Sequence, residues 1–492
     1  MKHSKAWWDN NCQKDLDMYR QSKQLEDWKR FKETVKRAKH NFFDGKIDEI
    51  ANKKCSPWEL MNLVKKRKLP AIEAIQYNSY PCIKLEDLWV ALHNFFNSAQ
   101  NCQIDIHLLV EIPNKEVIVW ASFLKAELIN AIDKCNNSLT PGLDKLSWRH
   151  LKKIVKNKEC IDKLINIANI YIDLSHWPSH FKTSTTVIIS KSNKTLYDST
   201  KSFHTIVLLN TTEKLFEKMI GEQLQFLLIS NNFIHMYQLD GLKHRSTTDT
   251  GVALTHFLQS GWVKNLSTSM LAFDIAQFFP LLNHQLLPLI LNKAGFNQKV
   301  STFFSNYLVN RKTKYLWNNF FSLLCNVGIG IRQESALSPI LFVLYLSLIF
   351  HILEKCLKIL KIPISILSFV DNGILISQNK LLSIYNMNLF CSYNVILSLL
   401  IKFGLVIEYS KTEVFHFSRL HGAFNPSPLD LTSLRGLILL PKTTWRYLGF
   451  IFDYKLSFWS HIDFYAKKAI STIKCMKMLG NSSRGLILLQ KR

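Results

Sequence analysis

The chain has 492 residues, of which 47% are hydrophobic and 12% aromatic, a content that supports buried cores and excludes a disordered tail. Its 62 lysines and arginines against 37 aspartates and glutamates give a formal net charge of +25. Such an excess favours a polyanionic partner, either nucleic acid or an acidic membrane surface, and charge alone does not choose between them.

The first 70 residues are basic, with 18 Lys and Arg against 10 Asp and Glu, a net charge of +8. Apolar residues at helical spacing across residues 28–42 predict a basic helical arm. A solvated charged helix face has the same spacing, whereas the interleaved Trp7, Trp8 and Trp28 favour contact with nucleic acid.

Cysteine usage and the N-terminus indicate the compartment. The ten cysteines include no C-x-x-C pair and no zinc-finger spacing, so we interpret them as free thiols of a reducing compartment. The N-terminus has no apolar stretch of signal-peptide length, which argues against secretion. The run KKRK at residues 65–68 has the composition of a nuclear import signal. We therefore predict an intracellular protein of the nucleus or cytoplasm.

The predicted secondary structure changes near residue 140, from helices alone to a mixture of helices and strands. The sequence of residues 71–139 indicates helices, which we expect to pack against the rest of the protein. Together with the basic arm they would form a helical N-terminal extension, residues 1–139. A turn, a helix over 148–175 and a strand over Thr185–Ser190 then begin a mixture of helices and strands. We expect an α+β domain over residues 140–455.

Two acidic residues stand within apolar segments. The stretch SMLAFDIAQFFP predicts a strand over Met270–Phe273 that ends at Asp274, and SILSFVDNGILIS predicts a β-hairpin with Asp371, Asn372 and Gly373 at its turn. Asx-Gly pairs also form ordinary turns. An acid in such surroundings is destabilising unless it is paired or bound to metal. Two acids on adjacent strands offer the oxygen ligands that Mg²⁺ prefers, as in polymerases.

Residues 336–353, ALSPILFVLYLSLIFHIL, contain no Asp, Glu, Lys or Arg. The stretch is just long enough for a membrane span. Ser338 and Pro339 at its start resemble a helix N-cap followed by proline at the first helical position, so a buried helix explains it equally well.

The last segment, residues 456–492, predicts a basic helix. From residue 458 it has seven Lys and Arg against Asp463 alone, and no terminating signal follows the helical pattern. We expect the chain to be truncated there.

A series of short motifs occurs in order over residues 140–460. They are TPGLDKLSW, VIISKSNK, KSFHTIVLLNTTEKLFEKMI, GLKHRSTTD, AFDIAQFF, GIRQESALSPILFVLYL, SFVDNG, GLVIEYSKTEVFHFS and WRYLGFIFD. Their order and spacing resemble the reverse transcriptases of non-LTR (LINE-like) retrotransposons of fungal type. The resemblance implies right-hand polymerase fingers and palm with an antiparallel palm sheet, a helical N-terminal extension and a truncated helical thumb. It also makes residues 336–353 a palm helix, with no membrane partner.

The resemblance implies an RNA-directed DNA polymerase that adds dNTPs to a DNA primer on an RNA template. Two Mg²⁺ ions would serve the reaction, with Mn²⁺ as a substitute. Asp274, Asp371 and Asn372 stand at the metal-binding positions, and Lys411 stands where the family has a proton donor to pyrophosphate.

Further positions correspond to nucleotide binding. The resemblance places a lysine and a histidine near the triphosphate, an aromatic gate that excludes a ribose 2′-hydroxyl, and a template-gripping pair at the nascent base pair. These residues are Lys191, His204, Phe279, Gln333 and Glu334.

Three positions depart from the family pattern. Asn372 replaces the second residue of an Asp-Asp pair, Glu334 replaces a glycine, and His204 replaces an arginine. Each removes a ligand or positive charge, or adds negative charge, where a triphosphate would bind. We therefore expect a degenerate copy, and the alternative function is a catalytically inactive remnant that keeps the fold and binds nucleic acid. No endonuclease motif precedes the basic arm, so we expect that this chain does not cut target DNA.

Overall fold

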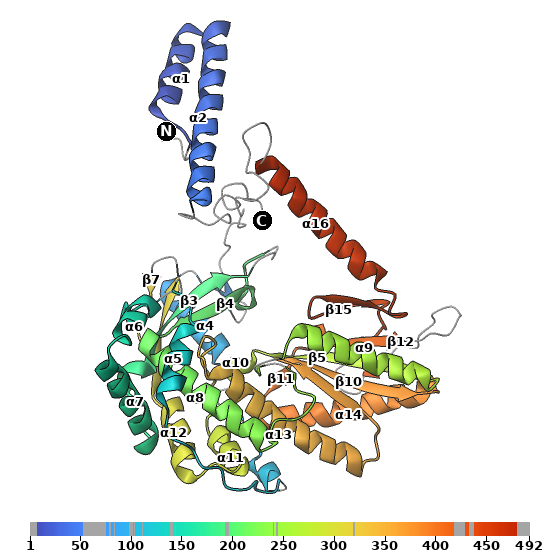
Figure 1. Cartoon of the computed structure of the whole chain (residues 1–492). Helices are drawn as coiled ribbons and strands as arrows, with labels where there is room; N and C mark the ends of the chain where they lie inside the picture. The colour runs from blue at the N-terminus through green and yellow to red at the C-terminus, as the bar shows by residue number, and fades with distance from the viewer. Residues whose placement is uncertain are drawn as a thin grey trace. The chain divides into compact units, whose positions relative to one another are not determined.

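The computed structural model describes most of the chain, which divides into two units, residues 71–462 and residues 1–70 with 463–492 (Figure 1). The described residues are 7–52, 75–77, 80–82, 84–97, 102, 104–110, 112–137, 141–142, 144–191, 196–239, 241–242, 245–317, 320–417, 429–431 and 437–479. The predicted import signal at 65–68 and the predicted truncated end at 480–492 lie outside them.

The basic arm is helical, as predicted, and it consists of two helices that form a hairpin, which was not predicted. The two helices are α1 (Asn10–Ser22) and α2 (Leu25–Ala51). The Trp28 ring packs against Tyr19 and Phe31, with ring centroids 4.8 and 5.4 Å apart. This tryptophan therefore contributes to the packing of the hairpin itself, and contact of the arm with nucleic acid stays a prediction.

A five-stranded antiparallel sheet is central to the larger unit. Its order is β11-β5-β10-β9, with β12 also paired to β5. The strands are β5 (Ser267–Ala276), β9 (Ser365–Phe369), β10 (Asn372–Asn379), β11 (Val406–Ile407) and β12 (Glu413–Phe417).

Alternation along the central strands buries both faces of this sheet. Leu271 and Phe273 of β5 join Leu375 of β10 in the largest hydrophobic core. Met270 of β5 and Ile374 of β10 point to the opposite face and a second core. Because a shift of one residue would exchange the two faces, the pairing register is strongly specified.

Helices cover both faces of the sheet (Figure 1). On the first face α13 (Ser338–Ile359) and α14 (Leu382–Lys402) supply the core. On the second face α9 (Thr247–Val263) packs with the hairpin of β15 (Thr444–Tyr447) and β16 (Phe450–Asp453).

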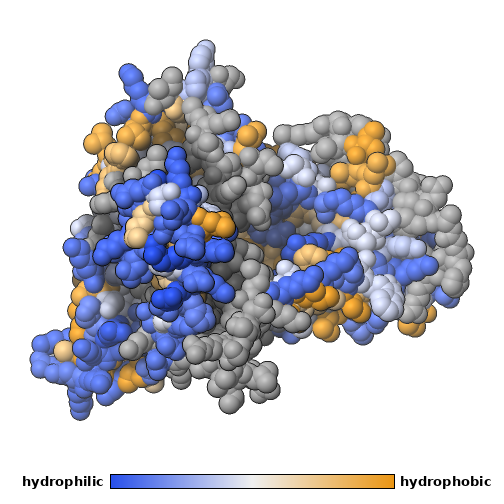
Figure 2. Space-filling model, turned by 90° about the horizontal axis from the view of Figure 1, so that it is seen from above, coloured by the Kyte–Doolittle hydropathy of each residue, from blue (hydrophilic) through white to orange (hydrophobic). Residues whose placement is uncertain are grey.

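The apolar stretch at residues 336–353 is a helix, as predicted. Among the described residues, two helices are long and apolar enough to cross a membrane, Ser338–Ile359 and Ser383–Lys402, and their apolar windows are 78% and 50% buried within the protein. The core helix of a globular domain has these properties too. Hydrophilic residues predominate on the face shown in Figure 2, with apolar patches between them.

A second sheet has the order β4-β3-β6-β7, with β8 also paired to β6. β3 and β6 are parallel, and the other pairs are antiparallel. The strands are β3 (Thr183–Ser190), β4 (Phe203–Leu208), β6 (Arg311–Trp317), β7 (Phe320–Phe321) and β8 (Cys325–Val327). β3 confirms the strand predicted over residues 185–190.

The helix predicted over 148–175 is two helices, because Asn157 caps a new start by accepting a hydrogen bond from the Glu159 amide at 2.8 Å. The remaining helices are α4 (Leu85–Phe96), α5 (Lys125–Asp133), α6 (Trp148–Ile154), α7 (Lys158–Asp173), α8 (Thr211–Ser230), α10 (Phe278–Leu281), α11 (Leu286–Lys293), α12 (Gln298–Leu308) and α16 (Trp459–Leu479). The short strands are β1 (Gln76–Tyr77), β2 (Tyr80–Pro81), β13 (Leu429–Leu431) and β14 (Leu437–Leu439), and the 3₁₀ turns are η1 (Ile106–Leu109), η2 (Ser179–Lys182), η3 (Thr200–Ser202) and η4 (Tyr409–Lys411).

The predicted hairpin exists, but its predicted turn is wrong. Phe369 pairs with Asn372, so the turn consists of Val370 and Asp371, and Gly373 lies within β10. A Cβ atom at Gly373 would lie 2.2 Å from Cζ of Phe273. Gly373 is therefore required by the ring packed over it, and the pairing register overrides the turn preference of the Asn-Gly pair.

We expect Gly373→Ala to lower the free energy of unfolding by about 1–3 kcal/mol, because the added methyl group overpacks the contact with Phe273. Urea unfolding followed by circular dichroism measures the change. In the double variant Phe273→Leu/Gly373→Ala part of the loss should be regained relative to the sum of the single changes. Simple additivity of the two substitutions would contradict this account.

Candidate active site

The ends of two central strands bring Asp274, Asp371 and Asn372 together. Asn372 lies directly opposite Asp274 in the β5–β10 register. The backbone oxygen of Asp371 accepts a hydrogen bond from the Ile275 amide at 2.8 Å. Asp274 lies two residues inside β5, and not at its end as predicted, because the strand continues through Ala276 to pair with β11.

The tip of the hairpin has an uncommon backbone conformation. Val370 has φ 53°, a left-handed value that is unfavourable for a β-branched residue. Asp371 follows at the second turn position, and the Asn372 amide group donates to Asp371 Oδ1 at 3.0 Å. Strain of this kind is retained where the surrounding structure determines it, and here pairing on both sides of the turn does so.

Lys411 joins the acidic pair from a different element. Its ammonium forms an ion pair with Oδ2 of the buried Asp274. The preceding Glu408 amide donates to the Asp274 backbone oxygen at 2.8 Å, which fixes η4 beside β5. Burial lowers the pKa of Lys411, but the hydrogen bond and charge of Asp274, with the charges of Asp371 and Glu408, raise it above its ordinary value. The amine therefore stays protonated at neutral pH.

Phe279 and Gln333 belong to two segments that are bonded to each other. The Ile331 amide donates to the Phe279 oxygen at 2.7 Å, and the Gly330 amide donates to the Leu282 oxygen at 2.8 Å. Gly330 has φ 73°, and a Cβ there would lie 2.5 Å from the Pro280 oxygen. Only glycine fits this close approach.

The side chains of these two segments differ in exposure. Phe279 is half-buried against Phe342, with ring centroids 5.7 Å apart. Gln333 and Glu334 are exposed in the turn before α13, and Gln333 lines a pocket with Arg311. The backbone before Gln333 and Glu334 is fixed by hydrogen bonds, while the side chains of these two residues are accessible from solvent.

A buried charged network holds the turn that bears Gln333 and Glu334, and sequence analysis missed it. Arg332 forms an ion pair with Glu213 of α8 and donates to the Phe181 oxygen at 2.7 Å. Glu217, one turn further along α8, accepts from the Ala336 amide at 3.1 Å and from Tyr307 at 2.7 Å. The paired residues are 90 or more positions apart in sequence, so no local spacing signals them.

The network contains two carboxyl groups for one nearby guanidinium. Glu213 and Glu217 are fully buried, and Oε2 of Glu213 has no hydrogen-bond partner. Burial is the main cause that raises the pKa of Glu213 to about 8, against the lowering effect of Arg332. Burial also raises the pKa of Glu217. A proton on Glu213 therefore relieves repulsion between the two acids.

Arg311 fixes the start of the same segment. Its guanidinium is buried and donates to the Ile329 oxygen at 3.1 Å, and it also donates to the Gly330 oxygen. His284 lies 2.7 Å from that guanidinium, and burial together with the charge of Arg311 lowers the His284 pKa to about 3. The histidine is therefore neutral and adds no second positive charge to this buried site.

Lys191 and His204 lie together at the far end of the β3–β4 pair. His204 pairs with Ile189, and the Lys191 amide donates to the Ser202 oxygen at 2.9 Å. The Lys191 ammonium donates to the Lys201 oxygen at 2.8 Å. His204 and Lys191 therefore lie in and beside the sheet that contains β3 and β4, whereas Asp274 and Asp371 lie in and beside the central sheet.

Comparison with known proteins gives the following matches. Residues 189–452 match the family described as "Reverse transcriptase (RNA-dependent DNA polymerase)". A protein named "Probable RNA-directed DNA polymerase from transposon BS", from Drosophila melanogaster, is 22% identical over 382 residues, which cover 74% of this chain and 40% of that protein. The chain thus spans less than half the length of this curated relative.

Among solved structures, an apo telomerase from Candida tropicalis, truncated from its C-terminal domain, is similar with a TM-score of 0.39 and 16% sequence identity. The match covers 57% of this chain and 54% of that one.

Glu213→Gln should reduce the pH dependence of stability. In the folded chain the Glu213 pKa is about 8, against an ordinary 4.5. The contribution of Glu213 to the free energy of unfolding is therefore fully present below pH 4.5 and is lost as pH rises through 8. Wild-type unfolding free energy should fall by a few kcal/mol across this window relative to that of the variant. Urea titrations at about pH 5 and pH 8 measure the difference. The exposed Glu159→Gln is the control, and equal slopes for all three proteins would contradict the prediction.

Proposed function

The chain belongs to the reverse transcriptase (RNA-dependent DNA polymerase) family, and from this we propose that it is an RNA-directed DNA polymerase. It would transfer nucleotides from dNTPs to a primer 3′-hydroxyl on an RNA template. The observation that carries the proposal is the register that sets Asn372 opposite Asp274, with Asp371 next to it at the hairpin tip. All three residues lie inside the segment that matches the family.

The side chains of the site fit a divalent metal ion. Asp274 and Asp371 offer carboxylate oxygens and Asn372 offers an amide oxygen, the donor types that suit Mg²⁺, or Mn²⁺ in its place. The Asn372 nitrogen donates to Asp371, so its oxygen is the atom left for a ligand role. Bound there, two such ions would activate the primer hydroxyl and neutralise charge on the phosphates.

The remaining roles belong to the side chains of the chain itself. The protonated Lys411 ammonium, held beside Asp274, would give a proton to the departing pyrophosphate. Phe279 would exclude a ribose 2′-hydroxyl, and Gln333 would contact the nascent base pair. Lys191 and His204 at the end of β3–β4 would receive the triphosphate when a nucleotide bridges the two sheets.

The finer assignment extends the family resemblance. We assign the central antiparallel sheet to a polymerase palm, the β3–β4–β6 sheet to fingers, and residues 456–492 to the start of a thumb. The domain boundaries 1–139, 140–455 and 456–492 stay predictions, as do the non-LTR lineage of fungal type and the nuclear or cytoplasmic location. Similarity to a transposon polymerase supports a retroelement origin.

Loss of metal binding should abolish synthesis and leave nucleic-acid binding intact. We expect Asp274→Asn and Asp371→Asn each to lower primer extension about 100-fold or more, because each removes a charge that holds the catalytic cation. A poly-rA/oligo-dT duplex with Mg²⁺ or Mn²⁺ is the substrate, and fluorescence anisotropy measures its binding. Asp162→Asn, an exposed acid on α7, is the matched control. Full activity of either site variant would refute the site.

The three departures from the family pattern favour one second candidate, an inactive remnant that binds nucleic acid. Glu334 places a negative charge in the exposed turn beside Gln333, and Asn372 removes one carboxylate. Restoring Glu334→Gly, Asn372→Asp and His204→Arg together should raise primer extension by orders of magnitude if these positions limit the enzyme. Unchanged extension by the triple variant, with equal duplex binding, would show that they do not.

A further inference from the structure

A loop between α8 and α9 is fastened to the side of α13. The His235 amide donates to Ser347 Oγ at 3.1 Å, and the Ser347 hydroxyl donates to Gln238 Oε1 at 2.6 Å. One helical turn further along, His351 Nε2 lies 3.0 Å from the Phe233 backbone oxygen. Loop residues 233–238 are therefore held to the helix at two successive turns.

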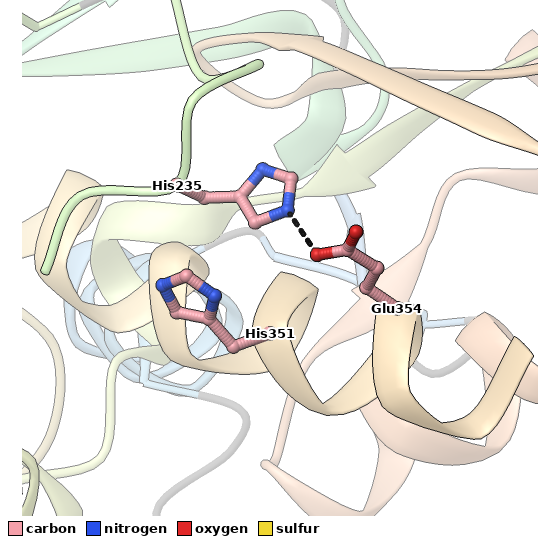
Figure 3. A group of neighbouring side chains, drawn as sticks. All are labelled: His235, His351 and Glu354. Carbon is pink, nitrogen blue, oxygen red and sulfur yellow. Dashed lines mark ion pairs between the residues drawn. The ribbon is translucent and has the colours of Figure 1, made fainter. Parts of the chain in front are cut away.

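Three metal-ligating side chains face one another at this attachment (Figure 3). His235 comes from the loop, while His351 and Glu354 come from α13 at i, i+3 spacing and so share one helix face. One ligand atom of each lies within 4.8 Å of the others. His235 Nε2 is 3.5 Å from Glu354 Oε2, close to the roughly 3.3 Å between two donors on one tetrahedral zinc ion.

Contacts outside the cluster orient two of the three ligands. His351 donates through Nε2 to the Phe233 oxygen, which leaves the lone pair of Nδ1 for a metal. Glu354 Oε1 pairs with the Lys358 ammonium at 3.0 Å, which leaves Oε2 facing His235. A backbone carbonyl on a ligand histidine and a hydrogen-bonded ligand carboxylate are the supports that metal centres use.

His235 is the most deeply buried of the three side chains. Its side chain is 3% exposed. Its Nδ1 is buried without a hydrogen-bond partner, so the contact of Nε2 with Glu354 is the polar interaction that positions the ring.

We propose that His235, His351 and Glu354 bind one Zn²⁺ ion, with a water molecule as fourth ligand on the half-exposed side of Glu354. Two imidazoles and one carboxylate are a zinc set, whereas Mg²⁺ prefers oxygen ligands alone. The site is separate from the acidic pair at Asp274 and Asp371. It does not depend on the proposed polymerase activity.

The ion would cross-link the loop to the core helix at a point that supports the catalytic hairpin. The loop continues into residues that bond to β9: the Ser368 amide donates to the Tyr237 oxygen, and the Leu239 amide donates to the Ser368 oxygen, both at 3.1 Å. Ser368 lies three residues before Asp371. Zinc at the cluster thus stabilises the backbone from which the hairpin tip projects.

Metal analysis of the full chain tests the proposal. The protein is stripped with a chelator, dialysed against Zn²⁺ and then against metal-free buffer, and bound zinc is measured by atomic emission. We expect about one zinc per chain, a visible absorption band typical of tetrahedral coordination when Co²⁺ replaces it, and a rise of a few degrees in Tm with Zn²⁺. His351→Ala and Glu354→Gln should abolish all three effects.

The control addresses zinc bound elsewhere, because the chain has ten cysteines and other histidines. His256→Ala removes an exposed histidine on α9 and should keep all three effects of the wild type. Circular dichroism checks that each variant is folded, and Glu354→Gln keeps the volume of the side chain. Zinc retained at wild-type stoichiometry by folded His351→Ala and Glu354→Gln proteins overturns the proposal, as does a wild type without zinc after dialysis.

Discussion

β5 pairs with β10 over eight residues, from Asn372 opposite Asp274 to Asn379 opposite Ser267. Alternate side chains of both strands enter two different cores, so no other register buries the same apolar surface. The position of the acidic residues is a consequence of that burial. Once the apolar residues are fixed, Asp274 and the hairpin tip at Asp371 must meet at the same end of the sheet.

The charged groups behind the site show a second constraint. Arg332, Glu213 and Glu217 are buried in the core that supports the turn with Gln333 and Glu334. Apolar residues of similar volume would often be equally stable in such a place. The network differs from apolar packing in one property: its hydrogen bonds to the Phe181 oxygen and the Ala336 amide are directional. It therefore sets the position of the turn as well as its burial.

The spacing of apolar residues predicted the helices and strands whose buried faces can be read from their own sequence. The helix at Ser338–Ile359, the strand at Thr183–Ser190 and the hairpin around Asp371 all carry their apolar pattern locally. The turn was misplaced because Asn372-Gly373 has a strong local preference, and only the partner strand reveals that Phe273 occupies the space beside Gly373. Contacts such as Arg332 with Glu213 join residues far apart in sequence, and no spacing rule contains them.

α13 connects these observations. Before its first turn lies the segment that Arg332 fixes, and Ser338 donates to the Arg332 oxygen at 2.5 Å, a role that replaces the N-cap predicted for it. Nine residues later Ser347 holds the loop that bonds to β9. The turn with Gln333 and Glu334 and the hairpin with Asp371 are thus attached to one buried helix. Since the helix is packed into the core along its length, the two parts of the site share a rigid support, and a change in its packing acts on both.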